Sequence, residues 1–297
     1  MPNTLAHLGV AGLVTRSFIK DADLKWIFIG GIIPDLPWIF QRFAWMFFPD
    51  INAYDLRLYV IVQSTLLFGI IFSLALASLS KEYLKTFLIL SAGCLIHLLL
   101  DSLEVKWANG VHLFAPLNWE LLNFNLFWNE SIPIYLITLF GLIYFFLLLR
   151  KGINSPLNLE LKKSSRWILF LIFTLIYFIL PSFILYQPLE ANNHYVKTLQ
   201  NISERPGKYF EIDRRSYRFE NGKGIINTFA DEDIELRNIN LKTSETISIK
   251  GKFLDEKTAE VIDYHVYSVL LRDGTTYVGI ILIFMFWILS LFKREKN

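Results

Sequence analysis

Long apolar runs separated by short polar stretches make up most of residues 1–186 and 273–297. A membrane-spanning helix needs about 20 mainly apolar residues. Segments 56–79, 83–101, 132–149 and 167–186 meet this length, and 277–292 is slightly shorter. Segment 26–48 is also long enough, but GGIIPDLP at 30–37 interrupts it with glycines and prolines that a helix accommodates poorly. The pattern predicts a polytopic α-helical membrane protein with about five to six membrane segments, one of them broken or re-entrant.

The polar stretch 187–272 has a different periodicity. Apolar and polar residues alternate from 246 to 253, which is typical of a strand with one buried face. Runs at 208–212, 216–219, 234–241 and 261–271 are similar, and the turn sequence ENG at 220–222 lies between two of them. About five short strands indicate a small barrel or sandwich, and an oligosaccharide- or nucleic-acid-binding type of barrel is one topology that fits.

The predicted organisation therefore has three parts. Residues 1–186 form a membrane-embedded domain, 187–272 an inserted small all-β domain, and 273–297 a last transmembrane helix with its tail. The composition agrees with this division, because 54% hydrophobic and only 19% charged residues are unusual for a soluble domain. The net charge of +2 comes without a basic stripe, so the lipid bilayer is the expected partner and nucleic acid is not.

Basic residues indicate the orientation of the helices. Cytoplasmic loops of membrane proteins carry an excess of Lys and Arg. Beyond Arg57 and Lys106, the loops predicted on the other side contain few basic residues. The basic side carries Arg16, Lys20, Lys25, Lys81, Lys85, Arg150, Lys151, Lys162, Lys163, Arg166, Lys293, Arg294 and Lys296. The sequence thus predicts a multi-pass protein of the inner (cytoplasmic) membrane, with both termini cytoplasmic and the β-rich domain extracytoplasmic.

Candidate chemistry lies in the first 120 residues. His97 and Asp101 are four residues apart within an apolar run, so they share one face of a helix. Ionisable groups at membrane depth are costly and usually functional. Imidazole and carboxylate are also ligands of zinc, although the same pair can simply hydrogen-bond between packed helices. His7, Asp35 and His112 add further polar groups to apolar surroundings.

Three short motifs carry a resemblance to a known family. They are PNTLAHLG at 2–9, GGIIPD at 30–35, and HLLLDS at 97–102 followed by GV at 110–111 and LFAP at 113–116. Together they resemble the inner-membrane metal-dependent hydrolases that are also described as LexA-binding hydrolases. The resemblance covers about residues 1–120 and implies a membrane-bound, metal-dependent hydrolase. The order His, Asp and His-x-x-x-Asp is also similar to that of zinc-dependent phospholipases C, which implies phosphodiester hydrolysis.

One position departs from the family pattern. The family usually has a His-Ser pair in the helix after the Pro-Asp motif, where this chain has Gln63 and Ser64. A neutral amide is a weaker ligand than imidazole, which leaves open a scaffold that has lost activity. The resemblance also does not account for the β-rich insert or the last helix.

These observations lead to one leading hypothesis and one alternative. We expect His7, Asp35, His97 and Asp101 to bind a divalent metal, with zinc the expected ion, and His112 to be a further ligand or a general acid. The metal would activate water to attack a phosphoester or lipid-linked substrate. Predicted substrate contacts are Gln63, Ser64, Trp107 and Asn109. The alternative is a non-catalytic anchor or scaffold that presents the β-domain to an envelope partner. A transporter is disfavoured because no inverted repeat is evident.

Straight helices would separate the proposed ligands. His7 would lie near the cytoplasmic face, whereas Asp101 would lie some 24 Å from Lys85 along its helix, at about 1.5 Å per residue. Either the N-terminal apolar stretch re-enters the bilayer, or the site contains fewer residues than the motifs suggest.

The basic residues generate a topology prediction. A reporter fused after Lys296 should be cytoplasmic, and one inserted near Asn221 should be extracytoplasmic, because the two positions flank the last predicted helix. Compartment-specific reporter activity measures this directly. If both reporters show the same compartment, the last helix or the boundary of the insert is misplaced.

Overall fold

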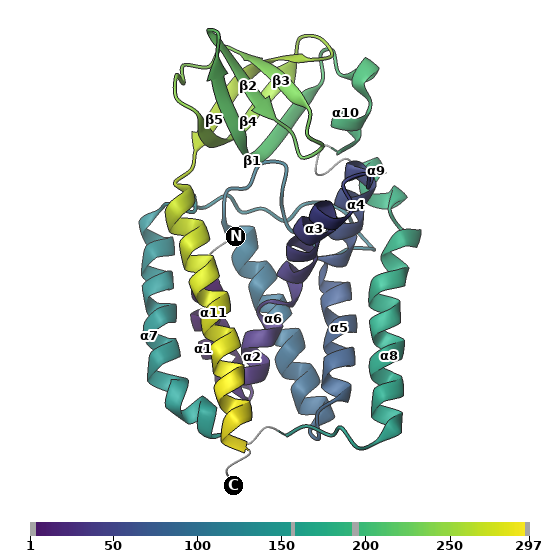
Figure 1. Cartoon of the computed structure of the whole chain (residues 1–297), viewed down its shortest axis with the longest axis vertical. Helices are drawn as coiled ribbons and strands as arrows, with labels where there is room; N and C mark the ends of the chain where they lie inside the picture. The colour runs from purple at the N-terminus through teal and green to yellow at the C-terminus, as the bar shows by residue number, and fades with distance from the viewer. Residues whose placement is uncertain (1–3, 156–157, 192–195, 295–297) are drawn as a thin grey trace.

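A computed structural model describes residues 4–155, 158–191 and 196–294 of the chain. A set of helices forms one region, and a five-stranded barrel lies at one end of it (Figure 1). Along the chain, the barrel lies between α8 (Ser164–Ile179) and α11 (Val269–Arg294), within the polar stretch 187–272 for which strands were predicted.

The helical region contains segments of very different length. Among the described residues, four helices are long and apolar enough to cross a membrane, and one bent pair would make a fifth. Together they confirm the coarse prediction of several membrane-length helices. The elements are α1 (Thr4–Phe18), α2 (Leu24–Gly30), η1 (Ile33–Asp35), α3 (Leu36–Phe47), α4 (Ala53–Gln63), α5 (Leu66–Ser78), α6 (Tyr83–Leu103), α7 (Ile132–Asn154), α8 (Ser164–Ile179), η2 (Leu180–Phe183), α9 (Tyr186–Ala191) and α11 (Val269–Arg294).

Two segments are broken inside the helical region. The predicted break at 30–37 is present, since α2 ends at Gly30 and α3 begins at Leu36 after a short 3-10 turn. Segment 56–79, expected as one straight helix, is instead bent by 68° between α4 and α5. The hydroxyls of Ser64 and Thr65 donate to the carbonyls of Ile61 and Val62 at the end of α4, so side chains satisfy backbone groups that the bend releases.

Apolar side chains cover the outside of the helical region as well as its core. The core between α1, α2, α6, α7 and α11 includes Leu8, Ile27, Phe145 and Phe286. The outer faces of α7, α8 and α11 expose large apolar residues that include Leu136, Leu139, Leu147, Ile168, Leu171, Leu175, Ile281 and Phe284. Contiguous exposed apolar surface of this kind marks contact with lipid or with another protein.

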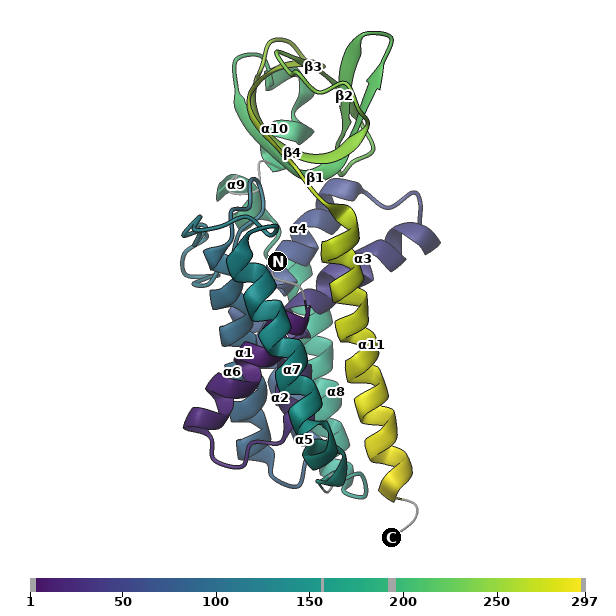
Figure 2. The same cartoon turned by 90° about the vertical axis from the view of Figure 1, so that its left-hand side faces the viewer.

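Helix α1 lies among the other helices rather than at their far end. It begins on the side of the barrel, whereas α11 ends at the opposite end of the helical region (Figures 1 and 2). A Cβ on Gly9 or Gly141 would collide with backbone of the facing helix, so the two glycines allow α1 and α7 to pack closely. The start of α1 therefore does not lie beside the end of α11.

The barrel is closed, with strand order β1-β2-β3-β5-β4. Strands β3 and β5 run parallel, and the other neighbouring strands run antiparallel. This is the order of the oligosaccharide- and nucleic-acid-binding type of barrel, and such an order defines a fold without defining a ligand. The strands are β1 (Tyr209–Glu220), β2 (Lys223–Asn227), β3 (Asp233–Arg237), β4 (Glu245–Phe253) and β5 (Thr258–Val266), preceded by α10 (Val196–Gln200) and η3 (Ile202–Glu204).

The expected strand boundaries need correction. Runs 208–212 and 216–219 are one strand, β1, whose register shifts between Ile212 and Arg215. The shift extrudes Asp213 and Arg214, which interrupts the alternation on which the prediction depended. Strand β2 was not predicted, because only KGIIN follows the turn at 220–222. Run 261–271 ends as a strand at Val266, and α11 begins at Val269.

The barrel packs on the segment that joins α6 to α7. The His265 ring stacks on Trp128 with centroids 3.8 Å apart, and its Nε2 lies 3.1 Å from a Glu130 carboxylate oxygen. Burial alone would raise the pKa of Glu130, but the contact with His265 and nearby backbone groups lower it. Because the pKa of Glu130 is lowered, its contact with His265 stabilises the docked barrel at pH values above the usual pKa of a carboxyl group. This stabilisation is lost as the pH falls through the lowered pKa of Glu130.

The barrel has a core of its own and should fold alone. Phe210, Tyr217, Ile247, Ile249 and Phe253 are buried within it, and Tyr54 of α4 packs against this core from the helical region. A fragment of residues 196–268 should therefore be soluble and show the circular dichroism of strands with a cooperative thermal transition. A helical or unfolded spectrum would show that the core depends on the helical region.

Candidate metal centre

His97 is fixed by the broken segment between α2 and α3. Its Nδ1 lies 2.6 Å from the carbonyl oxygen of Gly31, which can only accept, so Nδ1 carries the proton and Nε2 keeps the lone pair. Metal-bound histidines commonly donate their second nitrogen to a carbonyl in this way. The contact requires close packing of α2 on α6, which glycine at position 93 allows. A Cβ added there would lie only 2.8 Å from the carbonyl carbon of Gly30 and would push the two helices apart.

His7 and Asp101 meet His97 in the interior of the helical region. One ligand atom from each of the three residues lies within 4.8 Å of the others, and all three side chains are buried. His7 Nε2 is 3.3 Å from Asp101 Oδ1, and His97 Nε2 is 3.6 Å from Asp101 Oδ2. The two imidazoles are stacked with centroids 3.9 Å apart. Helix α1 thus brings His7 to α6 although 90 residues separate His7 from His97.

Asp35 lies at the edge of this group. Its Oδ1 is 3.5 Å from His97 Nε2, and its side chain is 19% exposed, whereas His97 is almost fully buried. The 3-10 turn that ends at Asp35 places the carboxylate beside the imidazole. The structure therefore brings all four residues predicted as metal ligands into one neighbourhood, with Asp35 outside the tightest set of three.

Two charged residues close to Asp101, Glu104 and Lys106, were not among the predicted site residues. Lys106 Nζ lies 3.1 Å from Asp101 Oδ2 and 3.8 Å from Glu104 Oε2, and all three side chains are buried. In the sequence Lys106 counted only as a loop charge. The signal that could have identified them is the run DSLEVK at 101–106, in which three charges directly follow an apolar helix. The ammonium supplies one positive charge to Asp101.

A small cavity of about 40 Å³ lies against His97 and Asp101. This volume accommodates a few water molecules or an ion. The two breaks face it, through Pro34 on one side and through Ser64 and Thr65 on the other. Breaks of backbone at this depth occur where they line such a cavity.

His112 also lines this cavity, outside the set of three. Its Nδ1 lies 2.8 Å from the Trp119 carbonyl oxygen, so Nδ1 is the donor. Burial lowers the pKa of His112 to about 4, although the contact with Trp119 opposes the shift. The imidazole is consequently neutral at neutral pH, which suits a ligand or a proton acceptor better than the general acid that was considered.

The predicted substrate contacts separate into different environments. Ser64 lines the cavity, whereas Gln63 donates to the Tyr177 carbonyl on α8, 3.2 Å away, and does not line it. Trp107 is buried under the barrel, with Lys250 4.5 Å from its ring centroid. Asn109 lines the cavity and donates to Asp213 of β1 over 3.3 Å.

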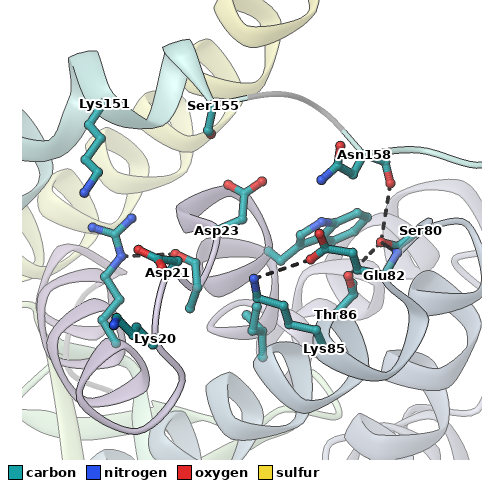
Figure 3. A pocket seen from close by; sticks show the side chains of 14 residues that line it. Lys20, Asp21, Asp23, Ser80, Glu82, Lys85, Thr86, Lys151, Ser155 and Asn158 are labelled. Carbon is teal, nitrogen blue, oxygen red and sulfur yellow. Dashed lines mark hydrogen bonds and ion pairs between the residues drawn. The ribbon is translucent and has the colours of Figure 1, made fainter.

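A second cavity opens at the other end of the helical region. It measures about 440 Å³ and is lined by basic and acidic side chains from several loops, among them Arg16, Lys20, Asp21, Asp23, Glu82, Lys85 and Lys151 (Figure 3). Lys85 and Glu82 form an ion pair of 3.4 Å across one wall. Four of the basic residues predicted as cytoplasmic, Arg16, Lys20, Lys85 and Lys151, thus line one cavity at the end away from the barrel.

Comparisons of the chain with family models, with curated proteins and with solved structures found no match. The geometry of the site therefore carries the functional argument.

The packing of α2 on α6 generates a test of the centre. Gly93→Ala would push Gly30 away by overpacking and displace the Gly31 carbonyl from His97. Loss of such an outer hydrogen bond typically costs roughly 10- to 100-fold in metal affinity. A zinc titration of the purified protein should show this weakening although every ligand remains. Gly274→Ala is the matched control, since nothing lies within 4 Å of the added Cβ. Wild-type affinity in Gly93→Ala would contradict the role of this contact.

Proposed function

We propose that the chain is a multi-pass protein of the inner membrane and a metal-dependent hydrolase of phosphoester or lipid-linked substrates. The observation that carries the proposal is the buried group of His7, His97 and Asp101. All three residues lie in the motifs on which the resemblance to membrane-bound, metal-dependent hydrolases rests.

Membrane insertion is supported by the surface of the helices. The apolar outer faces of α7, α8 and α11 would be costly in water and are matched to lipid. Basic residues gather around the cavity at the end opposite the barrel, which supports a cytoplasmic location for that end. The barrel would then be extracytoplasmic. Because α1 begins on the side of the barrel, the N-terminal apolar stretch is proposed to enter the membrane without crossing it from the basic end.

The donor set suits a divalent ion such as zinc. Nδ1 of His7 and Nε2 of His97 are buried and make no hydrogen bond to any described residue, and His7 Nε2 has Asp101 Oδ1 beside it at 3.3 Å. Buried polar atoms without partners are rare and often belong to sites that bind an ion or water. Two imidazoles and one carboxylate form a common zinc ligand set that leaves a position open. Asp35 would complete or adjust this set.

In this proposal a bound ion would supply Lewis-acid polarisation and lower the pKa of water. The water oxygen would bond to phosphorus, the phosphorus–oxygen ester bond would break, and the alkoxide would leave as the alcohol with the proton that His112 had taken from the water. His112, neutral at neutral pH, would accept the proton from water, and Lys106 would favour negative charge that develops beside Asp101. Ser64 would contact the substrate in the cavity.

A non-catalytic anchor is the second candidate, and Lys106 is the observation that favours it. Its ammonium neutralises Asp101 and lies near Glu104, so the buried charges are partly balanced without an ion. The polar group would then join α1 to α6, and the helices would serve to present the barrel.

Removal of ligands separates these two candidates. His97→Ala and Asp101→Ala should each lower zinc affinity by more than the roughly 10- to 100-fold typical of an outer-shell loss. Hydrolysis of a chromogenic phosphodiester should be lost in parallel. Metal content by elemental analysis and circular dichroism measure binding and fold separately. His265→Ala is the matched control, because His265 lies on the barrel and outside the group.

A Lys106→Met variant sharpens the distinction. If an ion competes with the ammonium for Asp101, zinc affinity should be kept or increased, and zinc should raise the thermal stability of the variant. In the anchor, removing one partner of a buried pair costs about 3–5 kcal/mol, and zinc would not restore it. A wild-type protein without stoichiometric metal, together with a Lys106→Met variant insensitive to zinc, would leave the anchor as the function.

A further inference from the structure

A third cavity, of about 210 Å³, lies where the barrel meets the helical region. Side chains of α3 and α4 form one wall, and residues 211–215 of β1 form the other. Trp38 and Asn109 line both this cavity and the small one at His97, so the two cavities are neighbours with shared walls.

The lining has an excess of positive charge. Four guanidinium groups and two carboxylates line the cavity: Arg42, Arg57, Arg214 and Arg215 against Glu211 and Asp213. Both carboxylates already have partners. Asp213 pairs with Arg214 at 3.0 Å, and Glu211 accepts from the backbone N–H of Ala108 at 2.7 Å. Within the described parts of the chain, neither Arg42 nor Arg57 has a carboxylate oxygen within 4.0 Å.

Several buried donors of this cavity also lack an acceptor. Gln41 is 4% exposed, and its Nε2 makes no hydrogen bond to any described residue. The same holds for Nη1 of Arg214, whose side chain is 9% exposed, and for Nε of Arg57. These groups come from α3, α4 and β1, and all of them are N–H donors. A site that is rich in donors and positive charge is suited to an anion.

The backbone of β1 is shaped to place these groups. The bulge extrudes Asp213 and Arg214, and Arg214 adopts φ of 48°, a conformation that is uncommon for a residue with a side chain. Bulges and unusual backbone angles often direct side chains into functional sites. Arg57 is held in place from both sides, 4.6 Å from the ring centroid of Trp38 and 5.4 Å from that of Phe229 on the barrel.

We infer that this cavity binds a phosphate group through Arg57, Gln41 and Arg214, with Arg42 at its mouth. Guanidinium groups match the oxygens of phosphate with paired hydrogen bonds, and an amide N–H adds a further donor. As substrate recognition, the inference rests on the proposed hydrolase, since the neighbouring cavity would then hold the bond to be cleaved. It also gives the barrel a role, because β1 supplies Arg214 to the site.

The phosphate group could belong to a lipid or to a free ion, and binding experiments distinguish the two. The full chain in phosphatidylcholine nanodiscs, stripped of metal by a chelator, is titrated calorimetrically with inorganic phosphate and with soluble dihexanoyl phosphatidic acid. Dihexanoyl glycerol, which lacks phosphate, is the control probe. Binding of phosphate itself identifies a free anion, and binding of phosphatidic acid alone identifies a lipid headgroup. Both outcomes support the site.

Variants connect the binding to the cavity. Arg57→Gln should weaken binding roughly tenfold or more, the typical loss of a charge-assisted hydrogen bond. Because Arg57 also joins the helices to the barrel, Arg42→Gln provides a second variant at an exposed position and should weaken binding in the same direction. Arg237→Gln is the matched control, since Arg237 is exposed on β3 and pairs with Glu235. No binding of either phosphate probe, or equal binding by all variants, would overturn the inference.

Zinc content of the same samples separates this inference from the proposed hydrolase. The arginine variants should keep wild-type zinc affinity, because the cavity at the barrel contains none of the proposed ligands. Phosphate binding by a protein that holds no zinc would retain the anion site and reject the hydrolase. Zinc-dependent hydrolysis without phosphate binding in this cavity would retain the hydrolase and reject the anion site.

Discussion

The contact between His97 and the Gly31 carbonyl is the interaction on which the centre of the helical region depends. A helix that breaks in an apolar interior leaves a backbone carbonyl that needs a hydrogen-bond donor. A neutral imidazole in the same interior has an N–H that needs an acceptor. One hydrogen bond of 2.6 Å answers both requirements. It also sets the tautomer, so that the lone pair of Nε2 lies on the side of His7 and Asp101. The glycine contacts between α2 and α6 follow from this requirement, because bulkier residues would hold the carbonyl away from His97.

Charge balance is the second constraint on the same centre. Asp101 lies near two imidazoles and the ammonium of Lys106, and Glu104 lies close to that ammonium. A divalent ion would add positive charge to a site that already holds one fixed cation. The proposed hydrolase therefore requires the carboxylates of Asp35 and Asp101 together, with Glu104 partly balancing Lys106. In the anchor, Lys106 takes the place of the ion, and the same residues act as a link between helices.

Local patterns predicted much of this architecture. Apolar length identified most of the long helices, and the glycines and prolines at 30–37 located the first break. The second break was missed because Ser64 and Thr65 are ordinary residues in a helix, and their hydroxyls satisfy the bend only once it is formed. Strand alternation failed at Asp213 and Arg214, where a bulge changes the period. Distance in sequence was the other limit, since only the resemblance grouped His7 with His97 and Asp101, and no local pattern near His7 indicates that it packs against α6.

The bulge at Asp213 and Arg214, where the predicted strands were wrongly separated, also faces the helical region. Asn109, one residue from the buried Ala108 that donates to Glu211, reaches Asp213 across the junction. A barrel that served only as a separate module would gain little from directing charged side chains of β1 into a buried junction, since their desolvation is costly. A ligand shared by the two regions offsets that cost. The same argument applies to Arg57, whose guanidinium group lies between the rings of Trp38 in the helical region and Phe229 on the barrel. The two rings hold the plane of the guanidinium group, and its charge lines the cavity.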